Sequence, residues 1–236
     1  MVLGLATATA AWGQAPGMPG DMGFNAAVAR LFSEVPAFSA NVETTLTNKA
    51  DNSRLSVPMR MLKNGDRFRI EVDFVKMKGA GLAMQGLSAI QNIGMSRMTS
   101  LVLPKEKGMV VLFPELKYYT KVTLEEADLA SDGYQMSKRQ AGRDTINGQA
   151  CVRQNVVLTA KDGTRTEVTV WENPALERFP VRMLFRPEGA SMMMNFSEVQ
   201  LTAPGEDAFK VPPDYKGFNS IAGLMQEAMT RALSPK

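Results

Sequence analysis

Short stretches in which apolar and polar residues alternate dominate the middle of this 236-residue chain. Residues 55–61 and 68–74 each carry an apolar side chain at every second position, and residues 38–46 do so except at Thr44. Successive side chains of a β-strand point to opposite faces, so this period of two predicts strands with one buried face. Asn64-Gly65 lies between the second and third stretch, and Asn-Gly between alternating runs indicates a tight hairpin whose type I′ turn needs two residues with positive φ.

The same arrangement recurs further along the chain. Asn147-Gly148, Asp162-Gly163 and Glu188-Gly189 are turn signals between further alternating runs. These runs predict strands at 140–146, 149–158, 164–171, 181–185 and 190–199. Three earlier runs predict strands at 99–103, 109–113 and 118–122. About ten to eleven short strands joined by tight turns predict a mainly β fold with flanking helices. We expect a bent antiparallel sheet or unclosed β-barrel, covered by helical lid segments.

Three segments have helical instead of strand spacing. Phe24, Val28, Leu31 and Phe32 share one helix face, and the apolar residues of 219–233 form a second such stripe near the C-terminus. The third segment, 79–96, is uncharged and rich in glycine, which weakens a helix by about 0.5–1 kcal/mol per residue. We expect it to be a loose lid insertion, near 77–98, over one end or face of the sheet.

The first residues resemble the end of a secretory signal peptide. Residues 2–11 are small and apolar, and small residues at 13 and 15 precede Pro16 in the manner of a cleavage site. The positively charged start of such a peptide is missing, so a disordered leader is the alternative. We expect 1–15 to be a signal remnant or leader and 16–236 to form a single domain, periplasmic or otherwise exported and soluble.

The composition excludes much of the common chemistry of enzymes. The chain has no histidine and one cysteine, Cys151, which removes His-dependent catalysis, most zinc sites and any intramolecular disulfide. A buried structural thiol is the expected role of Cys151. The acidic residues of 125–128, with Glu71 and Asp73, are interpreted as a solvated face. We therefore predict that the protein is not an enzyme and binds no cofactor or metal ion. The net charge of +3 does not indicate a nucleic-acid partner.

Seventeen methionines are the most informative part of the composition. Several lie at inward positions of the predicted strands, others in the 79–96 segment and on the last helix. Methionine is flexible and polarizable, so it suits surfaces that bind varied apolar partners. A greasy cavity between sheet and helices is one interpretation, and a loosely specified, filled core is the other, because both give the same alternation.

The order of elements resembles a known family. FSANVETTLTN, RMLKNGDRFRIEV and LVLPKEKGMVVLFPELKYYTKV follow the first helix, and Phe209-Lys210-Val211-Pro212-x-x-Tyr215-Lys216 comes later. This order is similar to that of the LolA/LolB superfamily of bacterial periplasmic lipoprotein carriers, over about residues 24–216. The resemblance implies an unclosed antiparallel barrel whose helices cover a hydrophobic cavity that holds acyl chains. It places Lys63 near the arginine that functions in the carriers.

We therefore expect an exported binding or carrier protein of the bacterial envelope that holds a lipid acyl chain or an acylated lipoprotein, with at most peripheral membrane contact. The alternative is a non-enzymatic interaction or sensor module with a filled core and an envelope protein as partner. The expected ligand-binding residues are Met59, Met61, Phe68, Ile70, Val72, Phe74, Leu82, Met84, Leu87, Ile90, Val111, Phe113, Met183, Phe185, Met192, Met194 and Phe196.

Overall fold

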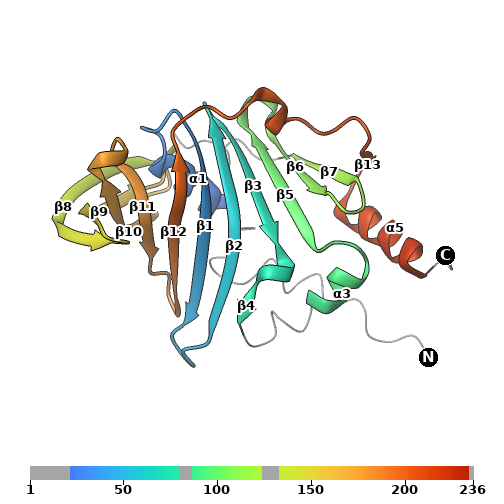
Figure 1. Ribbon diagram of the computed structural model, residues 1–236, viewed down its shortest axis with the longest axis horizontal. Helices are drawn as coiled ribbons and strands as arrows, with labels where there is room; N and C mark the ends of the chain where they lie inside the picture. The colour runs from blue at the N-terminus through green and yellow to red at the C-terminus, as the bar shows by residue number, and fades with distance from the viewer. Residues whose placement is uncertain (1–21, 80–86, 124–132, 234–236) are drawn as a thin grey trace.

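The computed structural model describes residues 22–79, 87–123 and 133–233, and strands make up most of it (Figure 1). The helices are α1 (Met22–Leu31), α3 (Leu87–Asn92) and α5 (Ile221–Leu233). The strands are β1 (Ala37–Asn48), β2 (Arg54–Asn64), β3 (Arg67–Asp73), β4 (Lys78–Gly79), β5 (Arg97–Leu103), β6 (Gly108–Phe113), β7 (Tyr118–Thr123), β8 (Gln135–Ile146), β9 (Gln149–Thr159), β10 (Arg165–Asn173), β11 (Phe179–Phe185), β12 (Ala190–Gln200) and β13 (Lys216–Phe218).

All described strands belong to one curved sheet, and the predicted fold class is confirmed. The order is β13-β7-β6-β5-β3-β2-β1-β12-β11-β10-β9-β8, with β4 paired to β2 off this path. The strand count exceeds the ten to eleven expected, because the two- and three-residue strands β4 and β13 are too short to show an alternating pattern. Every pairing is antiparallel except that of β13 with β7, which is parallel and corrects the expectation of a purely antiparallel sheet.

In the centre of the sheet, the first strand of the chain, β1, pairs with β12, a strand from near its C-terminal part. Two meanders, β1–β7 and β8–β12, meet where β1 pairs with β12 from Ser39↔Gln200 to Asn48↔Ala190. The side chains of Val42 and Phe196 face each other across this seam. One continuous sheet therefore results from two locally paired halves.

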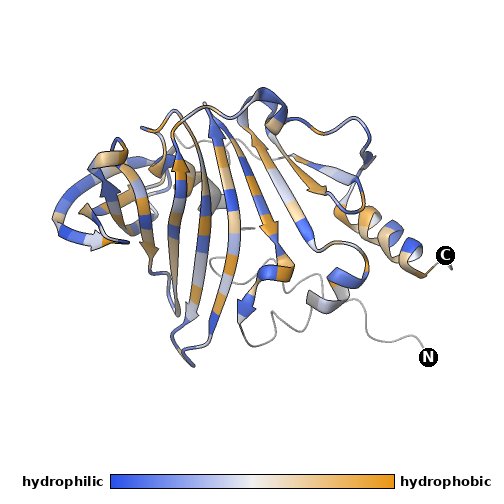
Figure 2. Cartoon of the chain, in the orientation of Figure 1, coloured by the Kyte–Doolittle hydropathy of each residue, from blue (hydrophilic) through white to orange (hydrophobic). Residues whose placement is uncertain are grey.

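The register divides the sheet into two faces, which we name the inner and the outer face. Paired residues lie side by side on one face, and one such row crosses six strands: Ala40, Met61, Ile70, Ser100, Val111 and Thr120. We define the inner face by this row and the outer face by the neighbouring residues Leu62 and Leu101. Figure 2 shows the resulting alternation of apolar and polar residues along the strands.

The helix α1 packs against the inner face of the central strands. Phe32, just after the helix, is fully buried among Phe38, Phe179 and Phe196, with ring centroids 4.8, 5.6 and 5.5 Å away. Tilted and edge-to-face rings at these separations attract one another beyond the area that they bury. This aromatic group belongs to the large core of β1–β3 and β9–β12.

A second inner-face cluster lies under α5. Leu224 and Ala228 are almost fully buried there, against Val111, Phe113 and other residues of β6 and β7. Ser220 accepts a hydrogen bond from the backbone N–H of Gly223 at 3.1 Å and so caps the helix. Met98 packs against both inner-face clusters, so they are continuous across the sheet.

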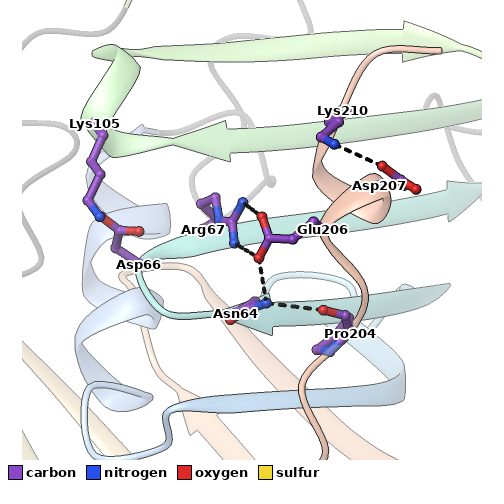
Figure 3. A network of polar contacts seen from close by, with 8 residues as sticks. All are labelled: Asn64, Asp66, Arg67, Lys105, Pro204, Glu206, Asp207 and Lys210. Carbon is purple, nitrogen blue, oxygen red and sulfur yellow. Dashed lines mark hydrogen bonds and ion pairs between the residues drawn. The ribbon is translucent and has the colours of Figure 1, made fainter.

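The outer face of β2, β3, β5 and β6 is crossed by residues 201–215, which we name the strap. Phe209 of the strap is 3% exposed and packs into a third apolar cluster with Leu62 and Leu101. Figure 3 shows the polar contacts beside it: Arg67 donates two hydrogen bonds to Glu206, at 2.7 and 2.8 Å, and Asn64 donates to the carbonyl oxygen of Pro204 at 3.1 Å. The chain then pairs as β13 at the sheet edge and returns to the inner face as α5.

The predicted hairpins form, with one difference in turn geometry. Asn147 and Gly148 both have positive φ, as a type I′ turn requires. At the earlier hairpin Asn64 pairs with Arg67, so the two turn residues are Gly65 and Asp66, and of these only Gly65 has positive φ. The side chain of Asn64 therefore lies outside the turn and donates its hydrogen bond to Pro204 of the strap.

The predicted lid insertion is only partly described. Within 77–98 the structure shows β4 and the six-residue helix α3, and residues 80–86 lie outside the described residues. Met77 and Met95 are buried at its two ends, in the first and second inner-face clusters respectively. The expectation of a lid is therefore not tested.

Candidate functional site

Most residues that the sequence offers for ligand binding lie in the large inner-face core. Met59, Met61, Phe68, Val72, Met183, Phe185, Met192, Met194 and Phe196 are all buried in that cluster, and Ile70 and Phe74 pack partly buried against it. Strand register explains the grouping, since Met183 pairs with Met194 and Phe185 with Met192. The inward positions were predicted from alternation alone, and the structure brings them together.

The remaining predicted residues lie elsewhere. Val111 and Phe113 are buried in the second inner-face cluster, with Ile90 of α3 packed against it. Leu87 begins α3. Leu82 and Met84 lie outside the described residues. Fourteen of the seventeen residues thus divide between two neighbouring clusters.

A hollow of about 1170 Å³ lies beneath α1 at the β8–β12 end of the sheet, and residues of both faces line it. Its apolar lining residues are Ala27 of α1, Val156, Val157, Val168, Phe185, Pro187 and Met192. The larger part of the lining is polar or charged and includes Tyr134, Lys138, Arg139 and Arg186. Small-molecule pockets of proteins commonly measure about 300–1,000 Å³, so the space suffices for a ligand of that size or larger. Phe185 and Met192 are the sequence-predicted residues that line it.

A buried carboxylate and its cationic partners lie beside this hollow. Glu172, 4% exposed, accepts a hydrogen bond from Arg178 at 2.7 Å and a weaker contact from Lys138 at 3.4 Å. Lys138 also donates to Glu34, in the loop after α1, at 2.8 Å. A buried carboxylate is costly unless cations and hydrogen-bond donors compensate it. The network therefore connects the loop after α1 to the sheet at the border of the hollow.

The alternation of apolar and polar residues does not predict this network. Lys138 pairs with the inward Val156, and Glu172 follows the inward Val168 and Val170, so a charged residue at an inward position was the signal available. Its partners come from distant segments, so the sequence alone did not show that the charges compensate one another.

Cys151 is buried in the fold, and the carboxylates of Glu71 and Asp73 accept hydrogen bonds from neighbouring residues. Cys151 is 2% exposed, as predicted, and burial raises the pKa of its thiol. Glu71 accepts a hydrogen bond from Arg69 at 2.6 Å, and Asp73 accepts one from the backbone N–H of Val75 at 3.1 Å. The acidic residues of 125–128 lie outside the described residues. Within the described ranges, no three His, Cys, Asp or Glu side chains are grouped so as to hold a metal ion.

None of the helices described here has the length and hydrophobicity to cross a bilayer. A scan of protein-family models gave no match to this chain. A search of curated protein sequences gave none either.

A search of solved structures found chains to which this one is similar. A LolA superfamily protein from Nitrosomonas europaea is 10% identical, with a TM-score of 0.44, over 80% of this chain and 97% of that one. The resemblance predicted from the sequence recurs in these structures. The lipoprotein LppX of Mycobacterium tuberculosis is 13% identical, with a TM-score of 0.39, over 77% and 96% of the two chains. LprF of Mycobacterium bovis is 16% identical, with a TM-score of 0.38, over 85% and 100%. Likeness at this level carries nothing about a ligand.

Proposed function

We propose that this chain is an exported binding protein that holds an apolar ligand, such as a lipid acyl chain, on the inner face of its curved sheet. The observation that carries the proposal is the hollow beneath α1, with its floor of Val156, Val168, Phe185 and Met192. The leader-like sequence of residues 2–15 supports export.

The binding would be non-covalent. Each methylene group that moves from water into the hollow contributes about 0.8 kcal/mol, so a long acyl chain is held by its length alone. Methionine beside Phe185 supports such a ligand, because the flexible thioether side chain adapts to ligands of different shape. An acylated lipoprotein presents the same chemistry as a free lipid and belongs to the same proposal.

The test is organic extraction and mass spectrometry of protein purified without detergent, followed by titration with a fluorescent apolar probe. We expect a lipid or fatty acid near one equivalent and a saturable gain in fluorescence. Val168→Trp fills the hollow from the sheet and should weaken probe binding at least tenfold. Arg60→Trp adds the same bulk at an exposed outer-face position of β2 and should leave binding unchanged.

A second variant keeps the test valid if Val168→Trp does not fold. Ala27→Phe fills the same hollow from α1, and circular dichroism establishes that each variant is folded. Folded Val168→Trp or Ala27→Phe protein that binds the probe normally would contradict the location of the site. Protein without extractable lipid and without any probe response would contradict the function and favour a filled-core interaction module.

A further inference from the structure

A second pocket, of about 510 Å³, opens on the outer face of β8–β11 and adjoins the hollow, with which it shares Arg139, Asn155, Thr169 and Arg186. We name it the arginine pocket, because Arg139, Arg153 and Arg186 line it together with Asn155, Thr169 and Trp171. Register explains their meeting: Arg139 pairs with Asn155, and Asn155 with Thr169, so these side chains lie in one row across three strands.

The positive charge of the pocket is only partly compensated. Arg153 is paired with Asp144 at 3.1 Å, and the same carboxylate accepts a hydrogen bond from the indole N–H of Trp171 at 2.7 Å. In the described part of the chain, Arg139 and Arg186 take part in no ion pair, and Arg186 donates only to the hydroxyl of Thr169 at 3.1 Å.

Neighbouring groups do not reverse this balance. Glu167, exposed on β10, lies on the same face but forms no ion pair with either arginine within the described residues. Arg182, the cross-strand partner of Trp171, adds a further positive charge, with its guanidinium carbon 5.9 Å from the Trp171 ring centroid and its Nε donating to Asn195 at 2.6 Å.

The chemistry of these side chains defines the ligand class. A guanidinium offers donors in a planar fork that matches the oxygens of phosphate, and such charge-assisted hydrogen bonds are stronger than neutral ones. Within the described residues Arg139 has no ion-pair partner and Arg186 donates only to Thr169, while Asn155 and Thr169 supply neutral polar groups between them. We infer that the arginine pocket is a binding site for a phosphate group, carried by a small molecule or by a lipid headgroup.

Trp171 provides the measurement. The chain has two tryptophans, so Trp12→Phe leaves Trp171 as the only indole fluorophore, inside the pocket. Titration of this variant with inorganic phosphate at constant ionic strength should change its fluorescence saturably, whereas chloride should not. Adding Arg139→Gln and Arg186→Gln should weaken the response at least tenfold.

The matched control removes the same charge elsewhere. Arg54→Gln with Arg60→Gln replaces two exposed arginines of β2 and should leave the phosphate response unchanged. A parallel arm measures binding to vesicles of phosphatidylcholine with and without phosphatidylglycerol. Dependence on Arg139 and Arg186 for free phosphate indicates a small ligand, and the same dependence for phosphatidylglycerol vesicles alone indicates a headgroup. No binding in either arm, or binding that the Arg139/Arg186 variant retains, overturns the inference.

Discussion

A single buried lysine shows how one side chain fixes the junction between helix and sheet. Lys63 is 5% exposed on the inner face of β2, and its Nζ donates to the carbonyl oxygen of Val35 at 2.6 Å. Phe68 lies beside it, with the ammonium 5.7 Å from the ring centroid. Burial lowers the pKa of Lys63, and the charge of Asp66 opposes this only in part. The side chain thus anchors the segment after α1 at an electrostatic cost.

That cost predicts a pH dependence of stability. Because the pKa of Lys63 is lower in the folded than in the unfolded chain, the unfolded chain binds more protons between the two values. The free energy of unfolding of the natural protein should therefore rise, relative to that of Lys63→Met, as the pH increases toward 10.5. Urea unfolding from pH 7 to 10.5 measures it, with Lys76→Met, at a 72% exposed side chain, as control. Parallel curves for natural protein and Lys63→Met would show that burial does not perturb this lysine.

At the scale of elements, the strap is held by one apolar anchor and one ion pair. Phe209 is buried under the guanidinium of Arg67, whose carbon is 4.9 Å from the ring centroid. The hydrogen bond from Arg67 lowers the pKa of Glu206, so this contact stabilises the fold at neutral pH and is lost as the pH falls through that lowered pKa. Exposed ion pairs contribute little, so the anchor is the larger part.

Removing the anchor should therefore be costly. Phe209→Ala is expected to lower the free energy of unfolding by about 3–5 kcal/mol, the usual range for a buried phenylalanine. Glu206→Gln should have a much smaller effect at neutral pH. Urea unfolding of both variants provides the comparison, and equal losses would mean that the ion pair, not the ring, fastens the strap.

Alternation predicted the long strands and most turns, since each depends on neighbouring residues. It did not predict β13, because three residues give no pattern and their partner Tyr118 lies far away in the sequence. The hollow has the same origin as the core around it: Phe185 and Met192 alternate like Met183 and Met194, and only the arrangement of α1 over the sheet distinguishes them. The arginine pocket arises from register across β8–β11, which no single strand contains.

At the scale of the molecule, the seam between β1 and β12 makes one cooperative unit of two meanders. Phe196 lies opposite Val42 at the seam. Its ring centroid is 5.5 Å from that of Phe32, which precedes β1, and 5.7 Å from that of Phe179 in β11. The large core includes residues from both sides of this seam. Local pairing holds each half, and this core holds the halves together.

A seam variant should consequently destabilise both meanders. Phe196→Ala is expected to lower the free energy of unfolding by about 3–5 kcal/mol. Hydrogen exchange of backbone amides in β3 and β10 should accelerate together, because both depend on the same global opening. Acceleration confined to β10–β12 would indicate that the meanders unfold independently.

The seam also determines when the protein is able to complete its fold. β1 finds its partner only after strands β2–β11 have been synthesised, because they lie between β1 and β12 along the chain. Pairing between segments so far apart requires the closure of a long loop, which slows folding. Until then the inner faces of both meanders stay open. The emerging chain therefore has a long interval in which its apolar strands depend on protection from aggregation. The same interval would keep the chain unfolded for passage through a membrane pore if it is exported as proposed.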